Sequence, residues 1–441
     1  MRKIKKVVLF SENEIKKVKK LRYDQNYSQA EESIIKLLNK QPDNYYAQAE
    51  YAQLAHELGK YELSTQQWEL LLNNKRIPEN EKIKFILRAA ESFLEANQKE
   101  KALNLLLSYH SFLPEAYLGL ANCYLPDQNA WLDAINQFFS QFSVNKVESL
   151  EHATSFYTSL SGKPEKSFQK SPKVSVIMSA FNAEKHLEFA ANSILAQSWK
   201  NLELIIVNDA SVDKTQEIAH KLENQDQRVK VIDNKINMGT YVSRNLALDM
   251  SSGDFVTTQD SDDWAHPDRL LYQVDNLLKN DYIANLTKSV RLSDDGKFEL
   301  TSWGSYLSDR CCASFMMKKD QAFPLFGYWD SVRVSGDVEY IERVYAVLGK
   351  KSIGILPEPL VFQLRHINSL TTAPLTMGVA GRVSQSREIY KSNYQAWHNQ
   401  LRIENCYISS PLVHRPFFAP LEIVVPTPGL VLYPQNQEEN D

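Results

Sequence analysis

The sequence predicts an α/β domain built on a parallel sheet, preceded by an all-α domain of helical repeats. After residue 173, short apolar runs alternate with segments of helical period, which is typical of strands joined by crossover helices. Before residue 155, the chain is helical in pattern and repeats itself after 34 residues. A polar stretch with Gly162, Pro164 and Pro172 separates the two parts, and 441 residues suffice for two or three domains.

Residues 1–155 form the first predicted domain. "NYSQAEESIIKLLNKQPDN" and "KYELSTQQWELLLNNKRIPEN" align with Tyr27 over Tyr61 and Ala30 over Ser64. A small side chain lets two helices approach closely, and a proline after the second helix of a unit ends that helix. The later small residues are Ala102 and Ala134, and the prolines are Pro42, Pro78 and Pro114. This pattern resembles tetratricopeptide repeats, which would bind a protein partner on a concave face or simply cap the next domain.

The second domain is expected at 173–425, after a linker at 156–172 and before a polar tail at 426–441. Its expected strands are 174–181, 202–209, 229–233 and 254–260, and its expected helices are 184–198, 213–224 and 239–252. In parallel sheets, ligands bind beyond the carboxyl ends of the strands. Polar clusters follow three of these strands: "AFN" at 180–182, "NDAS" at 208–211 and "DSDD" at 260–263. The sequence therefore predicts a ligand site along that edge.

Charge and cysteine usage narrow the class of protein. A formal net charge of −4 argues against nucleic-acid binding through bulk electrostatics. The cationic opening "MRKIKKVVLFSENEIKKVKKLR" suits either peripheral contact with an anionic membrane or a solvated helix face. The four cysteines show no CxxC spacing, which fits a reducing compartment, and Cys311 and Cys312 are expected in a strand. Because neither a membrane-length apolar stretch nor a signal-peptide core is evident, we expect a cytoplasmic protein, with the inner face of the membrane as the alternative location.

An acidic cluster follows the last expected strand of the sheet. Asp260, Asp262, Asp263 and Asp268 lie within nine positions of one another, and like charges at this range repel. Carboxylates at i and i+2 reach one site, and Mg²⁺ or Mn²⁺ prefers such oxygen ligands and leaves room for phosphate oxygens. The alternative is a solvated acidic loop, with Asp263 or Asp268 capping the helix that starts near Pro267.

Several motifs in order resemble one known family. "VSVIMSAFNAEKHLEFAANSILAQSWKNLELIIVNDASVDKT" and "NMGTYVSRNLALDMSSGDFVTTQDSDDWAHPDRL" are similar to family 2 glycosyltransferases of the GT-A fold. The resemblance is continuous from about 173 to 280 and weaker to about 420, and the helical repeats lie outside it. It implies a nucleotide-diphospho-sugar transferase with a Rossmann-like mixed sheet and inverting chemistry. Ser179 and Gln259 stand where the family often has Pro and an apolar residue, but neither departure removes a ligand.

The resemblance implies a donor site and a metal site. Donor-binding residues would be Ala180, Phe181, Asn182, Asp209, Gly239, Arg244, Asp260, Ser261 and Arg365, and metal ligands would be Asp262, Asp260 and His366. By this resemblance, the Ala180–Asn182 turn would lie along the nucleotide base, and Asp209 would hydrogen-bond the uracil ring. Gly239 and Arg244 would lie by the diphosphate and sugar, and the DxD motif of Asp260, Ser261 and Asp262 would hold the sugar and the metal.

Each of these residues also has an ordinary structural alternative. Asp209 would cap a loop, Gly239 would form the turn before a helix, Arg244 would be a surface helix residue, and His366 would be a surface histidine on a loop. Trp264 and His266 would either stack on a sugar or, for Trp264, anchor the core.

The acceptor side requires a base that takes the proton of the attacking hydroxyl. Asp337, in "VSGDVEYIERVYAVLG", is similar to the Asp that family members carry at the start of an acceptor-side helix. Members often have Glu-Asp where this chain has Gly336-Asp337, so Glu339 is the rival base. The ordinary alternative for Asp337 is a helix N-cap.

The sequence thus predicts a metal-dependent inverting glycosyltransferase that uses Mn²⁺ or Mg²⁺. Its donor would be a nucleotide sugar, expected to be UDP-linked, and its acceptor a glycan or lipid-linked glycan in bacterial surface polysaccharide biosynthesis, the latter by family analogy. A competing hypothesis is a tetratricopeptide-type scaffold with an inactive transferase domain, which predicts a missing carboxylate; Asp209, Asp260 and Asp262 are all present. A nucleotidyltransferase would carry a Gly-rich loop after its first strand, and "SAFNAEKH" has no glycine.

Overall fold

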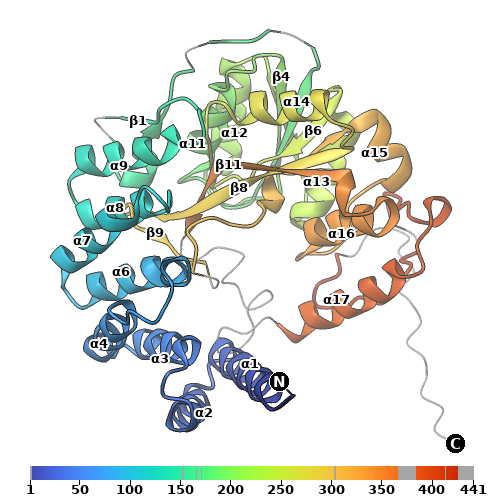
Figure 1. Cartoon of the computed structure of the whole chain (residues 1–441). Coiled ribbons are helices and arrows are strands. Elements are labelled where there is room, and N and C mark those ends of the chain that lie inside the picture. The colour runs from blue at the N-terminus through green and yellow to red at the C-terminus, as the bar shows by residue number, and fades with distance from the viewer. Residues whose placement is uncertain are drawn as a thin grey trace, which may run out of the picture. The chain divides into compact units, whose positions relative to one another are not determined.

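The computed structural model describes residues 2–150, 153–164, 166–169, 171–301, 304–365, 384–412 and 414–425, with the side chains of 2–11 and Tyr23 left aside. The chain divides into two compact units, each described by itself (Figure 1). The first, the helical unit, comprises the chain up to Gln141 together with the segment Lys297–Tyr306. The second, the sheet unit, begins at Phe142 and resumes at Leu307. The sheet unit thus begins upstream of the expected limit, and one later segment belongs to the helical unit.

The helical unit confirms the predicted all-α region. The small residues of the repeat lie on the second helix of each pair, where Ala30, Ser64 and Ala102 are fully buried and Ala134 is nearly so. The Ser64 hydroxyl donates to the Ala52 carbonyl of the preceding helix at 2.8 Å, so the two helices approach closely there. Pro42 comes just after α2 and its C-cap Gln41, as expected. Pro78 and Pro114 lie further past the ends of α4 and α7, and Pro78 is instead the N-cap of α5, so these two prolines do not end the helices before them. The helices are α1 Arg2–Tyr23, α2 Tyr27–Lys40, α3 Tyr45–Glu57, α4 Tyr61–Leu72, α5 Glu79–Lys82, η1 Ile83–Phe85, α6 Ile86–Glu95, α7 Lys99–Tyr109, α8 Ala116–Tyr124 and α9 Gln128–Ser140.

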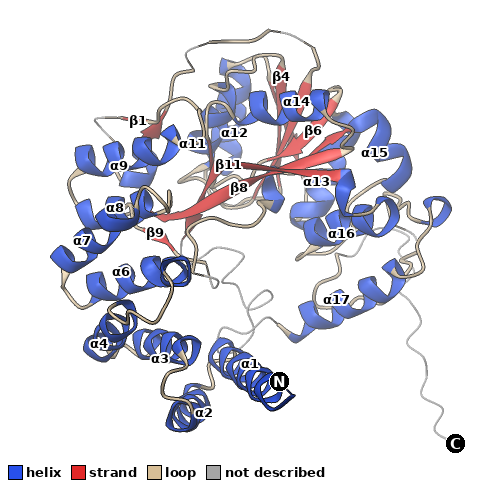
Figure 2. Ribbon diagram, in the orientation of Figure 1, coloured by secondary structure: helices blue, strands red, loops and turns tan. Residues whose placement is uncertain are grey.

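The sheet unit is built on a mixed sheet, whose strands are drawn red in Figure 2. The strand order is β5-β4-β3-β6-β10-β8-β11-β7. Strands β5, β4, β3 and β6 run parallel, β10 is antiparallel to both of its neighbours, and β11 is parallel to β8 and antiparallel to β7. The predicted parallel strands are confirmed. The strands are β3 Val174–Ala180, β4 Leu202–Asn208, β5 Val229–Asp233, β6 Phe255–Thr258, β7 Trp264–Ala265, β8 Ala284–Ser293, β10 Met316–Lys318 and β11 Ile353–Arg365, with a separate pair β1 Glu148–Ser149 and β2 Leu160–Ser161 and with β9 Phe298–Glu299 in the helical unit.

Helices cover both faces of this sheet because the strand residues alternate between two cores. Val176 and Leu204 pack with residues of α11, α12 and α14, whereas Ile177 and Ile205 pack with residues of α13, α15, α16 and α17. The helices are α10 Phe156–Ser159, α11 Leu187–Leu195, α12 Thr215–Gln225, α13 Gly239–Met250, α14 Arg269–Lys279, α15 Lys319–Phe326, α16 Gly336–Leu348, α17 Gln385–His398, η2 Cys312–Ser314, η3 Lys350–Ser352 and η5 Ile403–Asn405. The expected strand at Cys311 and Cys312 is wrong, because Cys312 opens η2 and β10 begins only at Met316.

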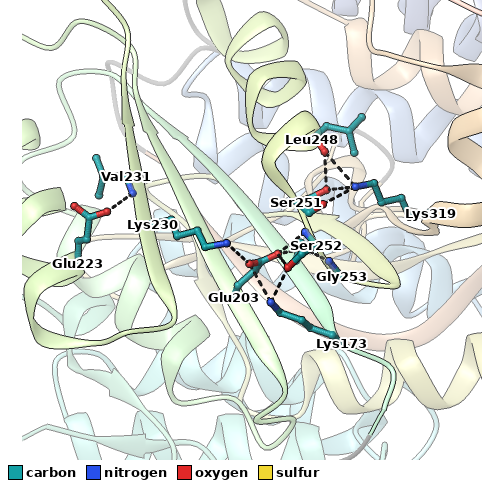
Figure 3. Close-up of polar contacts among 11 residues, drawn as sticks. Lys173, Glu203, Glu223, Lys230, Val231, Leu248, Ser251, Ser252, Gly253 and Lys319 are labelled. Atoms are coloured by element: carbon teal, nitrogen blue, oxygen red, sulfur yellow. Dashed lines mark hydrogen bonds and ion pairs between the residues drawn. The ribbon is translucent and has the colours of Figure 1, made fainter.

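The amino ends of the parallel strands are joined by a buried acid, Glu203 on β4 (Figure 3). One oxygen accepts hydrogen bonds from the Ser175 hydroxyl at 2.7 Å and from the amide and hydroxyl of Ser252 at 2.7 and 2.9 Å. The other accepts from Lys173 at 3.1 Å and Lys230 at 2.8 Å. Desolvation opposes ionisation, but these donors outweigh it and hold the pKa of Glu203 well below its ordinary value. Glu203 therefore ties the starts of β3, β4 and β5 to the loop before β6.

Among the described residues, none of the helices is both long enough and apolar enough to cross a membrane.

Candidate active site

The acidic cluster lies at the opposite, carboxyl edge of the same strands. β6 ends at Thr258, and Asp260 follows it with a partly exposed side chain whose Oδ1 accepts from Arg244 Nη2 at 2.7 Å. Desolvation raises the pKa of Asp260, Arg244 opposes that rise, and Asp262 and Asp337 add to it. The structure thus brings together four residues that the sequence predicted separately, two from the acidic loop and one each from α13 and α16.

Asp263 gives this edge a buried acid with one oxygen that has no hydrogen-bond partner among the described residues. Its side chain is 4% exposed, and its Oδ1 accepts from the Leu364 amide at 3.1 Å. Its Oδ2 is buried and makes no hydrogen bond to the described residues. Desolvation, with Asp262 and Asp260 adding repulsion, raises the pKa of Asp263 well above its ordinary value. This is the environment in which a bound cation would be stabilising, so the acidic loop fits a divalent metal.

A metal at this loop would depend on ligands from the substrate as well. Within the described part of the chain, no group of three or more acidic, His or Cys side chains is already arranged to hold a metal ion. Mg²⁺ is commonly held by one or two carboxylates together with substrate phosphates, which matches Asp262 and Asp260. His366, the third expected ligand, lies outside the described residues.

The acidic loop is supported from beneath by residues that sequence analysis missed. The buried Tyr157, in a region expected to be linker, donates from its hydroxyl to the carbonyls of Asp262 at 2.8 Å and Phe362 at 3.0 Å. Gln259, noted only as a departure from the family, donates from its side-chain amide to the Asp263 carbonyl at 2.7 Å. The fully buried Arg269 donates to Gln259 and, at 2.7 Å, to the Thr258 carbonyl. These bonds fix the loop backbone without using its carboxylates.

Arg244 contacts the acidic loop through Asp260 and lies over the ring of Tyr241. It is 3% exposed rather than a surface residue, and its Nε is buried without a hydrogen-bond partner among the described residues. Its guanidinium carbon lies 5.5 Å from the centroid of the Tyr241 ring. A buried guanidinium nitrogen with an unused donor suits an anionic ligand such as a phosphate.

Asp337 is held by Tyr241 and is no helix cap. Ser335 occupies the N-cap of α16, and Asp337 is partly exposed with its Oδ1 accepting from the Tyr241 hydroxyl at 2.8 Å. The N-cap alternative is therefore wrong. Family members often have Glu where this chain has Gly336, and the structure explains the difference. A Cβ at position 336 would lie 2.9 Å from the Tyr241 ring, which is too close. The absent side chain makes room for the ring that orients Asp337.

Glu339, the rival base, points into the protein core. It is fully buried, with Oε1 lying 3.1 Å from Arg343 Nε and 3.0 Å from His398 Nε2. Two positions along an α-helix turn a side chain by about 200°, so Glu339 and Asp337 face opposite sides of α16. Glu339 thus serves packing between α16 and α17, and Asp337 is the carboxylate on the side of the acidic loop.

The first loop and the second loop of the carboxyl edge are joined. Ala180 is buried at the end of β3, and its carbonyl accepts from the Asp209 amide at 2.8 Å. Asn182, with a φ of 48°, accepts on Oδ1 from the Val212 amide at 3.0 Å. Phe181 is 51% exposed and Val212 is 89% exposed, so both loops offer apolar surface to solvent.

Asp209 shapes the loop that leads into α13. Its Oδ1 accepts from Asn234 and from the Met238 amide, both at 2.8 Å, and its Oδ2 accepts from the Gly239 amide at 2.7 Å. Gly239 has a φ of 75°, a conformation that favours glycine. In this structure Asp209 therefore caps the loop, as the structural alternative predicted. If Asp209 contributes to donor binding, it would do so by positioning Gly239.

The remaining candidates separate into edge and core residues. Ser261 is partly exposed on the acidic loop, and Arg365 is the last residue of β11. Trp264 is 3% exposed with its ring 5.2 Å from that of Phe362, so sugar stacking is wrong for it. His266 is fully buried with Nε2 3.0 Å from the Asn145 carbonyl oxygen, and burial lowers its pKa to about 4. Asp268 is turned away as well, since it accepts from Asn145 at 2.9 Å.

This geometry defines an α/β domain with an acidic ligand site at the carboxyl edge of its sheet. Residues 175–321 match the family model described as Glycosyl transferase family 2. This part of the chain is therefore a family 2 glycosyltransferase domain, and its fold is GT-A.

Individual relatives cover the same region. An uncharacterized glycosyltransferase of Haemophilus influenzae is 40% identical over 112 residues, which is 25% of this chain and 35% of the relative. The UDP-Glc:alpha-D-GlcNAc-diphosphoundecaprenol beta-1,3-glucosyltransferase WfgD of Escherichia coli is 37% identical over 107 residues, which is 24% of this chain and 42% of the relative. The crystal structure of S. aureus TarS 1-349 in complex with UDP-GlcNAc has 20% identity and a TM-score of 0.38, covering 46% of this chain and 61% of that chain. The match spans less than half the length of both curated relatives.

Proposed function

We propose that this chain transfers a sugar from a nucleotide diphosphate sugar to a hydroxyl of a glycan or lipid-linked glycan, with inversion and with a divalent metal. The observation that carries the proposal is the convergence of Arg244, Asp260, Asp262 and Asp337 at the carboxyl edge of a family 2 domain. A UDP-linked donor is supported by the name of the Escherichia coli relative, which specifies UDP-Glc and a diphosphoundecaprenol-linked acceptor.

The metal would be Mn²⁺ or Mg²⁺, held by Asp262 with Asp260 beside it. When bound, it would neutralise the charge that develops on the diphosphate leaving group. The buried Asp263 oxygen that lacks a hydrogen-bond partner among the described residues, next to Asp262, supports a cation at this loop. Arg244 would bind a phosphate oxygen through its unused Nε, and Arg365 at the end of β11 would approach the diphosphate from the other side of the sheet edge.

Other residues of the carboxyl edge would bind the nucleobase and supply the catalytic base. The exposed Phe181 and Val212 would contact the nucleobase, while Asp209 would hold Gly239 and its loop in position. Asp337 would accept the proton of the acceptor hydroxyl as that oxygen attacks the anomeric carbon and the bond from this carbon to the diphosphate breaks. The Tyr241 hydroxyl would hold the Asp337 carboxylate in position for this step through its hydrogen bond to Oδ1.

The setting of this reaction is proposed from the relatives. A lipid-linked acceptor would match the diphosphoundecaprenol-linked acceptor in the name of the Escherichia coli relative. Surface polysaccharide biosynthesis is therefore the proposed process, with the cationic start of the chain as a candidate for peripheral membrane contact.

The proposal is tested by measuring UDP release from a panel of UDP-sugars with Mn²⁺, with and without candidate acceptors. We expect release with one donor by the wild-type protein, its loss on adding a chelator, and its loss in Asp262→Ala. Asp268→Asn is the matched control, because this nearby carboxylate is bonded to Asn145 and should be dispensable for turnover. Turnover by Asp262→Ala at the wild-type rate would contradict the proposed metal site, and no wild-type release from any nucleotide sugar would contradict the activity.

A further inference from the structure

One segment from a distant part of the sequence packs within the helical unit, with Phe298 and Glu299 in an extended conformation. Lys297–Tyr306 lies between β8 and β10 in sequence but belongs to the helical unit. It contacts the surface formed by Glu95 of α6, Glu115 before α8, Asn122 of α8 and Trp131 of α9, here called the clamp surface. The partners are far apart in sequence, as Asn122 and Phe298 are separated by 176 residues.

The side chain of Asn122 makes two hydrogen bonds to the backbone of this segment. Asn122 accepts on Oδ1 from the Phe298 amide at 2.7 Å and donates from Nδ2 to the Phe298 carbonyl at 2.9 Å. Both main-chain groups of one residue are thus satisfied by one buried amide, as a neighbouring strand would satisfy them. Such a contact recognises an extended backbone irrespective of the side chain that it carries.

Two aromatic side chains anchor the segment on either side of its centre. Phe298 is fully buried and stacks on the fully buried Trp131, with the ring centroids 6.1 Å apart. Tyr306 is 2% exposed, and its hydroxyl lies 3.4 Å from Nδ2 of Asn122. Buried aromatic anchors are the residues that carry most of the binding energy in peptide and protein recognition.

Charged groups fix the orientation of the segment. Glu115 accepts on one oxygen from the Ser305 hydroxyl at 2.7 Å and from the Tyr306 amide at 2.6 Å. At the other end, Lys297 forms an ion pair with Glu95. The clamp surface therefore distinguishes the two directions of the segment, which nonspecific apolar packing would not do.

We propose that the clamp surface is a peptide-recognition site whose ligand is the chain's own segment 297–306. On this proposal, the clamp surface binds the segment that connects β8 to β10 in sequence. The same surface is then not a free binding site for a separate protein partner. A partner that used the same surface would first have to displace this segment, which is covalently attached and so present at a high effective concentration.

The test removes the segment from the clamp surface and adds it back as a separate peptide. In the full chain, residues 297–306 are replaced by a Gly-Ser linker of the same length, and binding of a fluorescein-labelled KFELTSWGSY peptide is followed by fluorescence anisotropy. We expect saturable binding to this variant, none to the intact chain, and loss of binding when Asn122→Ala is added. Absence of saturable binding to the folded linker variant, or equal binding after Asn122→Ala, would overturn the proposal.

A second measurement covers the case in which the linker variant does not fold. Hydrogen exchange in the intact chain should show that Asn122→Ala lowers protection of the Phe298 amide by about tenfold or more, because its acceptor is lost. Asn104→Ala, an exposed asparagine on α7, is the matched control and should leave this amide unchanged. Equal protection in the two variants would overturn the proposal.

Discussion

The two ends of the parallel strands each carry buried or partly buried acids, but the two groups are neutralised very differently. At the amino end, Glu203 is surrounded by donors from four residues, and its pKa is lowered. At the carboxyl end, Asp260 is paired with Arg244, Asp263 has an oxygen without a partner among the described residues, and the pKa of both is raised. Acids that the fold satisfies stabilise it, whereas acids left in mutual repulsion indicate a ligand that supplies positive charge.

The largest expected effect is on catalysis at the carboxyl edge. Asp337→Asn should reduce transfer by about 10²- to 10⁴-fold, since the base is lost, while UDP binding with Mn²⁺ is retained. Initial rates with the donor found in the UDP-sugar panel, together with calorimetry, would measure both. A variant that keeps wild-type turnover would remove Asp337 from the mechanism.

The next effect is on stability at the amino edge. Glu203→Gln should lower the free energy of unfolding by about 2–4 kcal/mol, because it breaks a buried pair of ion contacts and leaves Lys173 and Lys230 facing a neutral group. Urea denaturation would measure this change, and UDP binding by the folded protein should be unaffected. A loss of UDP binding without a loss of stability would mean that the two edges are not functionally separate.

The pH dependence of stability also distinguishes the acid at the amino edge from those at the carboxyl edge. Glu203 has a folded pKa below its ordinary value of 4.5, so its stabilising contribution is complete above that value. As the pH falls below about 4.5 and approaches the lower folded pKa, the contribution is progressively lost. Wild type should therefore lose stability more steeply than Glu203→Gln in this acidic range, and parallel curves would refute the assignment.

Asp263 should show the opposite behaviour. Its pKa is raised on folding, so the ionised form is disfavoured in the folded protein and stability falls as the pH rises through the unfolded value. In metal-free buffer at pH 7, Asp263→Asn should raise the free energy of unfolding by about 1–2 kcal/mol, because the cost of protonating this buried carboxyl on folding is removed. Thermal unfolding would detect this gain, and a loss of stability would show that the carboxylate is satisfied without a cation.

The smallest effect concerns the residue that orients the base. Tyr241→Phe removes one hydrogen bond to Asp337 and keeps the ring that fills the space over Gly336. Turnover should fall by about tenfold, because the carboxylate is held less firmly, while donor affinity stays unchanged. Turnover equal to that of the wild type would mean that the contact only packs the helix.

Local patterns predicted much of the fold and the site. The period of the apolar residues placed β3, β4, β5 and β6, and the polar clusters after them marked the carboxyl edge. Asp337 was identified through its similarity to the Asp that family members carry at the start of an acceptor-side helix. Its choice over Glu339 needed the structure, since both carboxylates lie in the same first turn and only the packing of α17 shows which one is buried.

The missed features depend on partners that are distant in sequence. Tyr157 supports Asp262 across 105 residues, and no pattern around "SFYTSL" indicates it. Tyr241 and Gly336 are complementary only because α13 and α16 meet. Glu203 lies in an apolar strand, and its donors come from β3, β5 and the loop before β6. Such contacts follow from packing, which a single sequence does not display.

The measurement that tests the central claim most directly is calorimetric titration of UDP in the presence and absence of Mn²⁺. The account predicts saturable, Mn²⁺-dependent binding by wild type and by Asp268→Asn, and at least about tenfold weaker binding by Asp262→Ala, because the cation links carboxylate and diphosphate. Binding of equal strength by Asp262→Ala, or binding by wild type that is indifferent to Mn²⁺, would contradict the claim that the acids at the carboxyl edge are there to hold a cation.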